Sequence, residues 1–229
     1  MTPTPLRAAV AHAVSEPLQL DLIAEANHRI ANNLAMIAGL ARLQAGNVRD
    51  AEDRFTGREV RLMLQEFSGR VDAVARLHRL LANPGPPASI DLVDYLRGIA
   101  EGVIATMSHA GPVDLRFDGE ARCSISSKRA LPLGLIVGEL VTNAVKYAHP
   151  TGIAGRISVA CHKCPDGRIV VEVSDDGVGL PDGLDPMEST HLGLRLVRSL
   201  AQQLGAEIAF DDDGLGLRVA LSLCPASII

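Results

Sequence analysis

The stretch that decides the fold lies in the second half of the chain and reads Glu139-Leu140-Val141-Thr142-Asn143-Ala144-Val145-Lys146-Tyr147. It closes a helix predicted over residues 127–147, in which Glu139, Asn143 and Lys146 are four and three residues apart. Side chains at these intervals share one helix face, so a carboxylate, an amide and an ammonium project together. The set suits Mg²⁺ bound through an amide oxygen and water, with the lysine on phosphate oxygens. Ion pairing within the helix is the alternative explanation.

A second segment, Asp175-Asp176-Gly177-Val178-Gly179, follows a predicted strand at residues 168–174. Its glycines let the backbone come close to a ligand, and a carboxylate there can accept a hydrogen bond from the adenine amino group. The following loop runs to His191, where a further helix is predicted. Gly193 near that helix N-terminus would direct free amides toward phosphate, and Arg195 or Arg198 could add positive charge.

The region after residue 88 mixes helical and alternating hydrophobic patterns. Helices are predicted over residues 90–107, 127–147 and 191–204, and strands over residues 113–117, 156–161, 168–174, 207–210 and 217–223. Pro165-Asp166-Gly167 predicts a hairpin between the second and third strands. These elements predict an α+β sandwich, with helices on one face of a mixed sheet.

The region before residue 84 is predicted to be helical throughout. The second long helix carries apolar-seam positions at intervals of four and three residues: Val60, Leu64, Phe67, Val71, Val74, His78 and Leu81. The first helix repeats this rhythm from Ile23 to Ala41, so the pair is predicted to form an antiparallel hairpin. A lone hairpin leaves apolar flanks uncovered, and two copies would complete a four-helix bundle. We therefore expect a homodimer.

His28 lies in a polar stripe beside the apolar seam of the first helix, together with Asp21, Glu25 and Asn32. An exposed, uncharged imidazole is a nucleophile near neutral pH, and Glu25 one turn away could orient it or take its proton. The alternative is an ordinary solvated histidine. The nucleotide motifs elsewhere in the chain favour the nucleophile.

Composition excludes several classes of function. The chain has 229 residues, 47% of them hydrophobic, with 22 basic and 27 acidic side chains and a net charge of −5. Nucleic-acid binding is not expected, because neither part of the chain carries a basic field. No apolar run is long enough for a membrane span and the first residues lack signal-peptide features, so we expect a cytoplasmic protein that does not contact membranes.

The chain resembles the sensor histidine kinases, and within them the HisKA_2 subfamily, whose phosphoacceptor motif reads His-Arg-x-x-Asn-Asn. Here that motif is His28-Arg29-Ile30-Ala31-Asn32-Asn33, and the resemblance covers about residues 16 to 224. It implies a GHKL-type ATP-binding domain, ATP and Mg²⁺ as cofactors, and His28 as the phosphoacceptor. Glu25 and Glu139 are the other expected catalytic residues, with Asn143 and Glu139 at the metal. The residues expected to bind the nucleotide are Asn143, Lys146, Tyr147, Asp175, Gly177, Gly179, Gly193 and Leu194.

One position departs from the family pattern. The glycine-rich motif before the last predicted helix has His191 where the family usually has its first glycine, and the loop from Gly179 to Gly193 is short for an ATP lid. A side chain there could restrict the turn around the β and γ phosphates and weaken turnover.

The predicted organisation is an N-terminal tail over residues 1–15, a dimerisation and phosphotransfer hairpin over 16–83, a linker over 84–88 and an ATP-binding domain over 89–229. The expected function is a histidine autokinase that passes the phosphoryl group from His28 to the aspartate of a response-regulator receiver domain. The tail is too short for a sensory domain, so we expect input from another protein or a fused neighbour. Two rivals remain: a histidine phosphotransferase that uses no ATP, and an anti-sigma factor or serine kinase of the GHKL type.

Overall fold

The computed structural model describes residues 35, 38, 39, 41, 42, 45, 56–81, 89–107, 112–119, 123–149, 153–212 and 214–224. The chain divides into two units, Met1–Gly46 and Asn47–Ile229. The described positions of the first unit are helical. Most of the predicted first helix, including Glu25 and His28, lies outside the described residues. The predicted hairpin and the predicted domain boundaries therefore stay predictions.

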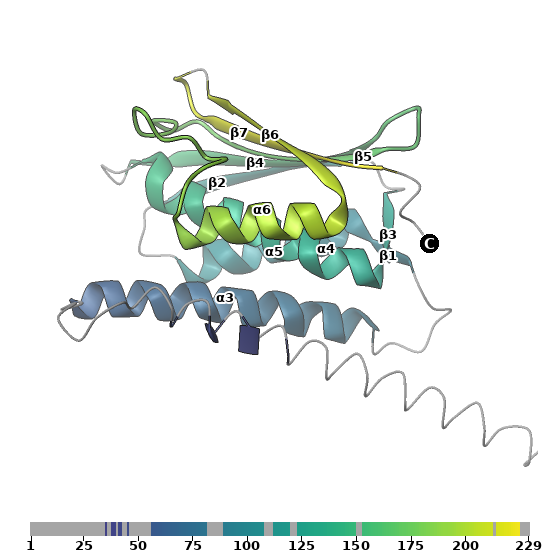
Figure 1. Cartoon of the computed structure of the whole chain (residues 1–229), viewed down its shortest axis with the longest axis horizontal. Helices are drawn as coiled ribbons and strands as arrows, with labels where there is room; N and C mark the ends of the chain where they lie inside the picture. Colours follow the sequence, from purple (N-terminus) through teal and green to yellow (C-terminus); the bar gives the residue numbers. More distant parts are fainter. Residues whose placement is uncertain are drawn as a thin grey trace, which may run out of the picture. The chain divides into compact units, whose positions relative to one another are not determined.

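A five-stranded mixed sheet forms one layer of the second unit, in the order β2-β4-β5-β7-β6 (Figure 1). The strands are β2 (Val113–Gly119), β4 (Gly155–Lys163), β5 (Ile169–Asp175), β6 (Ala206–Asp212) and β7 (Leu217–Leu223). β2 pairs with β4 in parallel, and the other neighbours are antiparallel. The predicted hairpin around Pro165-Asp166-Gly167 is confirmed by the β4–β5 pairing.

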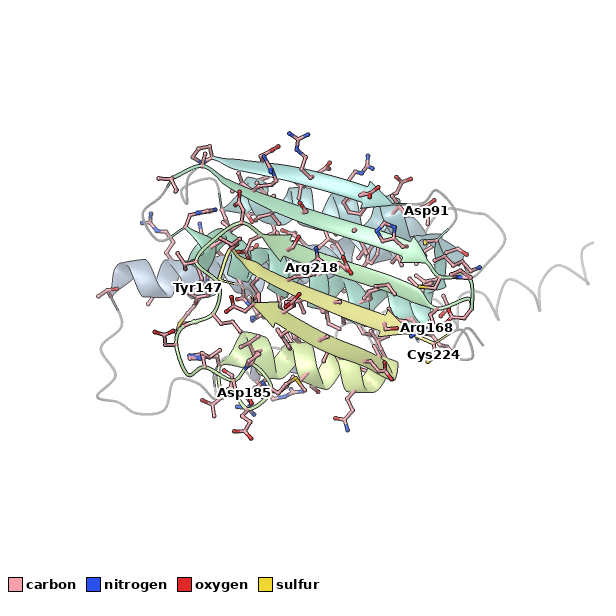
Figure 2. All side chains as sticks on the ribbon, turned by 90° about the horizontal axis from the view of Figure 1, so that it is seen from above. Asp91, Tyr147, Arg168, Asp185, Arg218 and Cys224 are labelled. Carbon is pink, nitrogen blue, oxygen red and sulfur yellow. The ribbon has the colours of Figure 1, made fainter. Side chains whose placement is uncertain are left out.

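Three helices cover one face of this sheet: α4 (Leu92–Thr106), α5 (Ser127–Asn143) and α6 (Leu192–Leu204). Alternate residues of β4 are buried, as expected for a sheet covered on one face. Figure 2 looks onto the other face, where Arg218 of β7 is exposed. The predicted α+β sandwich is therefore confirmed. None of the described helices combines the length and hydropathy that a bilayer crossing requires.

The long helix α3 (Gly57–Leu81) contacts α4 and α5. Within its predicted apolar seam, Val74 is 4% exposed, whereas Val60 and Leu64 are 42% and 63% exposed. The part of α3 around Arg70, Ala73 and Val74 thus packs against the sandwich. Nearer the start of the helix, Val60 and Leu64 are exposed.

Two local features differ from the predicted elements. The helix predicted from residue 90 begins at Leu92, because Ser89–Asp91 form a strand, β1, that pairs with β3 (Ser124–Ser126). The Asp91 side chain then accepts a hydrogen bond from the Asp94 amide and caps α4. The helix predicted to Tyr147 is α-helical only to Asn143 and continues as a π-helix, η1 (Ala144–Ala148).

Two glycines with open space around them should respond oppositely to the same substitution. Gly205 ends α6 with φ +60°, and Gly102 lies within α4; an added Cβ would meet nothing within 4 Å at either position. Gly205→Ala should lower the free energy of unfolding by about 1–2 kcal/mol, because an L-residue is strained at positive φ. Gly102→Ala should raise it by about 0.5–1 kcal/mol through helix propensity. Urea unfolding measures both, and equal signs would contradict the backbone assignments.

Candidate nucleotide site

A pocket of about 900 Å³ lies between α5 with η1, the loop after β5, and the start of α6. It brings together these predicted site residues: Glu139, Asn143, Lys146, Tyr147, Asp175, Gly179, His191, Gly193 and Leu194. Apolar side chains from the strands, among them Val173 and Phe210, complete its walls. Three motifs that are far apart in the sequence thus meet at one concave site large enough for a nucleotide.

The π-helix η1 shapes one wall of this pocket. A π-turn widens the helix by one residue per turn, and such turns are frequent at functional sites. It carries Lys146, which is partly buried, and Tyr147, which is 63% exposed. Burial lowers the pKa of the Lys146 ammonium, since desolvation disfavours the charged form. Lys146 would therefore attract an anionic ligand more strongly than an exposed lysine does, because water screens its charge incompletely.

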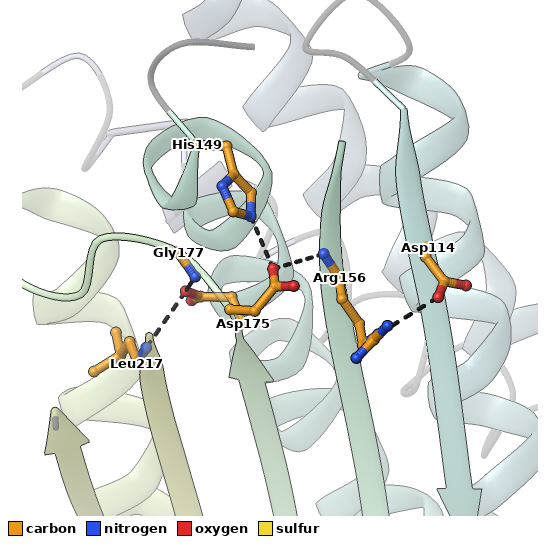
Figure 3. A network of polar contacts seen from close by, with 7 residues as sticks. Asp114, His149, Arg156, Asp175, Gly177 and Leu217 are labelled. Atoms are coloured by element: carbon orange, nitrogen blue, oxygen red, sulfur yellow. Dashed lines mark hydrogen bonds and ion pairs between the residues drawn. The ribbon is translucent and has the colours of Figure 1, made fainter. Parts of the chain in front are cut away.

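Asp175 ends β5 and lines the pocket. Figure 3 shows the polar contacts around it. Its Oδ1 accepts hydrogen bonds from the Gly177 amide at 3.0 Å and the Leu217 amide at 3.4 Å. Burial nevertheless raises the pKa of this carboxyl above its usual value, because desolvation outweighs both hydrogen bonds. A half-buried carboxylate at the floor of a pocket suits a ligand that donates a hydrogen bond, such as the adenine amino group.

The neighbouring Asp176 has a different environment. Its Oδ1 accepts from the Arg156 amide at 2.7 Å and contacts His149 Nε2 at 2.8 Å. The Arg156 amide is the main cause that lowers the pKa of Asp176, and His149 adds to it. Asp176 therefore joins the β5 loop to β4 and to the end of η1, whereas Asp175 faces the pocket.

The two predicted motif glycines fit their positions for steric reasons. A Cβ on Gly177 would overlap the backbone of Ala148, and the next amide, that of Val178, donates to the Ala148 carbonyl at 3.0 Å. Gly177 does not line the pocket; it packs the loop against η1. Gly179 has φ +72°, and a Cβ there would overlap the Asp212 carboxylate.

Asp212 and Arg198 fix the loop, a role that no sequence motif indicates for either residue. Asp212 accepts from the Leu180 amide at 2.7 Å and the Gly214 amide at 3.0 Å. Arg198 of α6 donates to the carbonyl oxygens of Pro186 and Ser189, each at 2.6 Å. The sequence predicts that Arg195 or Arg198 adds positive charge near phosphate, but the Arg198 guanidinium binds the loop backbone instead. Both carbonyls lie in the loop that precedes α6, and no local sequence pattern predicts that Arg198 binds them.

The start of α6 closes the pocket opposite η1. His191 precedes the helix with φ −58°, which any L-residue adopts, so its side chain does not strain this backbone. A Cβ on Gly193 would lie 3.0 Å from Glu139 Oε2 and 3.8 Å from Asn143 Oδ1. The absence of a side chain at Gly193 thus keeps the helix N-terminus close to the acidic and amide groups of α5. Free amides there favour a phosphate group.

Glu139 is buried and has an ion-pair partner from α3. Arg70 Nε donates to Glu139 Oε1 at 2.5 Å and Nη2 donates to Oε2 at 3.0 Å. The predicted catalytic and metal-binding glutamate therefore reaches the pocket with both oxygens engaged.

The donor set fits a nucleotide-bound Mg²⁺. In the described part of the chain, no three His, Cys, Asp or Glu side chains cluster as metal ligands. Mg²⁺ typically keeps several waters and binds through substrate phosphates and one or two protein groups. The Asn143 amide oxygen beside the α6 N-terminus meets that need, with Glu139 next to it.

Comparisons with known proteins agree with this architecture. Residues 128–226 match the family model for histidine kinase-, DNA gyrase B- and HSP90-like ATPases. Residues 25–107 match the HisKA_2 histidine kinase model. The chain therefore belongs to the histidine kinases, with a HisKA_2 segment ahead of an ATPase domain, and the family resemblance found in the sequence is confirmed.

The relatives carry the same description. Blue-light-activated histidine kinase 2 of Erythrobacter litoralis is 31% identical over 204 residues, which is 88% of this chain and 56% of the relative. Sensor histidine kinase PdtaS of Mycobacterium tuberculosis is 34% identical over 202 residues, which is 86% of this chain and 36% of the relative. The chain thus spans little more than half of one relative and about a third of the other.

A solved structure extends the likeness to the fold. The histidine kinase domain of the Erythrobacter litoralis EL346 blue-light-activated histidine kinase aligns with a TM-score of 0.68 at 28% identity. The alignment covers 90% of this chain and 94% of that domain.

We predict that Asp175→Asn separates binding from stability. Asn keeps an oxygen for the Gly177 and Leu217 amides but turns an N–H₂ donor toward the pocket, so ATP-analogue affinity should fall about 10- to 100-fold. A carboxyl whose pKa is raised on folding stabilises the fold below its unfolded pKa and loses that contribution as pH rises through the folded pKa. At pH 7 the variant should therefore be at least as stable as wild type. Calorimetric titration and urea unfolding measure the two effects; a large loss of stability would contradict this account.

Arg198→Met should loosen the loop without unfolding α6. Losing two charged donors to the Pro186 and Ser189 carbonyls should speed amide exchange in the loop about tenfold or more. Arg195→Met is the matched control, because Arg195 is exposed and does not line the pocket. Hydrogen exchange with mass spectrometry makes the comparison. Equal exchange in both variants would show that the Arg198 bonds do not hold the loop.

Proposed function

We propose that the chain is the catalytic core of a histidine autokinase, which transfers the γ-phosphoryl group of ATP to His28. The observation that carries the proposal is the pocket in which Asn143, Asp175 and Gly193 meet. It occurs in a chain whose HisKA_2 match, residues 25–107, includes His28. A nucleotide site and a phosphoacceptor histidine in one chain are the two parts that autophosphorylation needs.

The reaction is an in-line displacement. A lone pair on one His28 ring nitrogen forms a bond to the γ-phosphorus, the bond between that phosphorus and the bridging β-γ oxygen breaks, and ADP leaves with the electron pair. The proton on the other ring nitrogen becomes acidic as the bond forms, and Glu25 or Glu139 accepts it. Positioning and charge neutralisation supply most of the rate enhancement in such transfers.

The pocket residues have separate roles in this proposal. Asp175 accepts a hydrogen bond from the adenine amino group, Gly179 lets the loop backbone pass close to the base, and Gly177 packs that loop against Ala148. Lys146 and the amides of Gly193 and Leu194 bind phosphate oxygens, and Tyr147 borders the nucleotide. Asn143, with Glu139 beside it, would hold Mg²⁺, which neutralises phosphate charge when bound.

The partners follow from the family and from α3. A response-regulator receiver aspartate would take the phosphoryl group from His28, as in two-component systems. The exposed apolar side chains of Val60 and Leu64 support pairing of α3 with the first helix and with a second copy in a homodimeric four-helix bundle. A separate or fused input protein and a cytoplasmic location remain predictions.

The two alternative functions require different features of the pocket. A phosphotransferase that consumes no ATP has no use for a pocket lined by both the half-buried Asp175 carboxylate and the N-terminus of α6, so the pocket favours the kinase. A serine-directed or anti-sigma member of the superfamily would keep the pocket but would not depend on His28.

The decisive experiment incubates wild type and His28→Ala with γ-labelled ATP and Mg²⁺ and tests the stability of the label. We expect acid-labile, alkali-stable label in wild type and more than about 100-fold less in the variant, because the nucleophile is gone. Binding of an ATP analogue should be equal in the two proteins, which controls for folding.

Two outcomes would contradict the proposal. Acid-stable label that persists in His28→Ala would favour a serine-directed kinase. No label in a wild-type protein that binds ATP, but label on His28 after incubation with a phosphorylated receiver domain, would favour a phosphotransferase.

A further inference from the structure

The ion pair between Arg70 and Glu139 joins α3 to the wall of the nucleotide pocket. Its two parallel N–H···O bonds connect residues 69 positions apart, and the two side chains are 4% and 5% exposed. Bidentate guanidinium–carboxylate pairs are geometrically specific. Arg70 is thus held at one orientation, and it holds Glu139 in turn.

The pair occupies both oxygens of a carboxylate that the proposed reaction needs. Glu139 lines the pocket beside Gly193 and Asn143. The two guanidinium hydrogen bonds fix the orientation of this carboxylate, so turning it toward a bound nucleotide requires at least one of them to break. Breaking one arm of a buried, bidentate ion pair is unfavourable. Glu139 is therefore in a resting arrangement while α3 is docked in this way.

A second arginine lies on the same side of α3. A Cβ on Gly98 of α4 would overlap the Arg76 guanidinium, so Arg76 rests where Gly98 lacks a side chain. Between the two arginines, Ala73 and Val74 are 5% and 4% exposed. We call Arg70, Ala73, Val74 and Arg76 the docking face of α3.

The composition of the docking face suits a contact that opens. The desolvation cost of a buried ion pair nearly cancels its Coulombic gain. Among the described side chains of α3, the fully buried apolar ones are Ala73 and Val74, which are both small and bury little area. Docking is then specific in geometry but weak in net free energy, as a two-state element requires.

We infer that Arg70 is a positioning residue that latches Glu139, and that the ion pair must open for the kinase to reach its full rate. The inference rests on the proposed function for the role of Glu139. Any input that draws α3 away from α5 would release the glutamate and the ATPase domain together.

The test compares Arg70→Met with Arg61→Met in the full chain. Arg61 is an exposed arginine of the same helix, so the control makes the same substitution outside the docking face. In Arg70→Met, amide exchange over residues 68–76 should be about tenfold faster or more. The initial autophosphorylation rate at saturating ATP should rise roughly 3- to 10-fold, with KM for ATP changed less than about twofold, because the latch acts on Glu139 and not on nucleotide affinity. Arg61→Met should match wild type in all three measurements.

A second variant keeps the inference testable if Arg70→Met does not fold. Gly98→Leu displaces the Arg76 guanidinium without altering Arg70 or Glu139, and it should change exchange and rate in the same direction. If Arg70→Met loses cooperative unfolding, this variant carries the comparison. Rescue should follow with Arg70→Lys, whose retained charge should bring the rate partway back toward wild type.

The results separate failure of this inference from failure of the proposed function. Label in wild type with an unchanged or lower rate in a folded Arg70→Met overturns the latch alone. Unchanged exchange in residues 68–76 does so as well. Absence of label from wild type and every variant overturns the proposed function, and with it the link between the latch and Glu139.

Discussion

The half-buried carboxylate of Asp175 is the interaction on which the site depends. One amide from the loop after β5 and one from β7 donate hydrogen bonds to the same oxygen, yet burial still raises the pKa of this carboxyl group. The charged form of this carboxyl group is therefore less stable in the folded protein than in water. Around it, Gly177 packs on Ala148 and Asp212 holds the loop at Leu180, so this strand end can move little. Rigidity of this kind prepares a site for its ligand.

Much of the sandwich could be predicted because its signals are local. Alternating apolar residues around Pro165-Asp166-Gly167 predicted the β4–β5 hairpin, and helical spacing predicted α5 and α6 within a few residues. Spacing also placed Glu139, Asn143 and Lys146 on one wall of the pocket, although η1 departs from the α-helical geometry assumed for Lys146. The roles of these residues at a nucleotide remain predictions.

The features that could not be predicted are non-local. Asp212 lies 32 residues from the amide it holds at Leu180, and Arg70 lies 69 residues from Glu139. No local pattern connects such partners. The pairing of β1 with β3 was missed for the same reason, since each strand is too short to show a period. At His191 the backbone has φ −58°, which is open to any L-residue, while the predicted effect of its side chain on ATP turnover stays a prediction.

The Leu217 amide that donates to Asp175 comes from β7, the last strand of the sheet. β7 also lies between β5 and β6, so those two strands have no direct pairing. During synthesis, α6 and both glycine motifs would therefore be made before the strand that completes the pocket floor. A nascent chain released before residue 217 would expose the edge of β5 to water and to other chains. The pocket is in this sense completed by the last of the described strands.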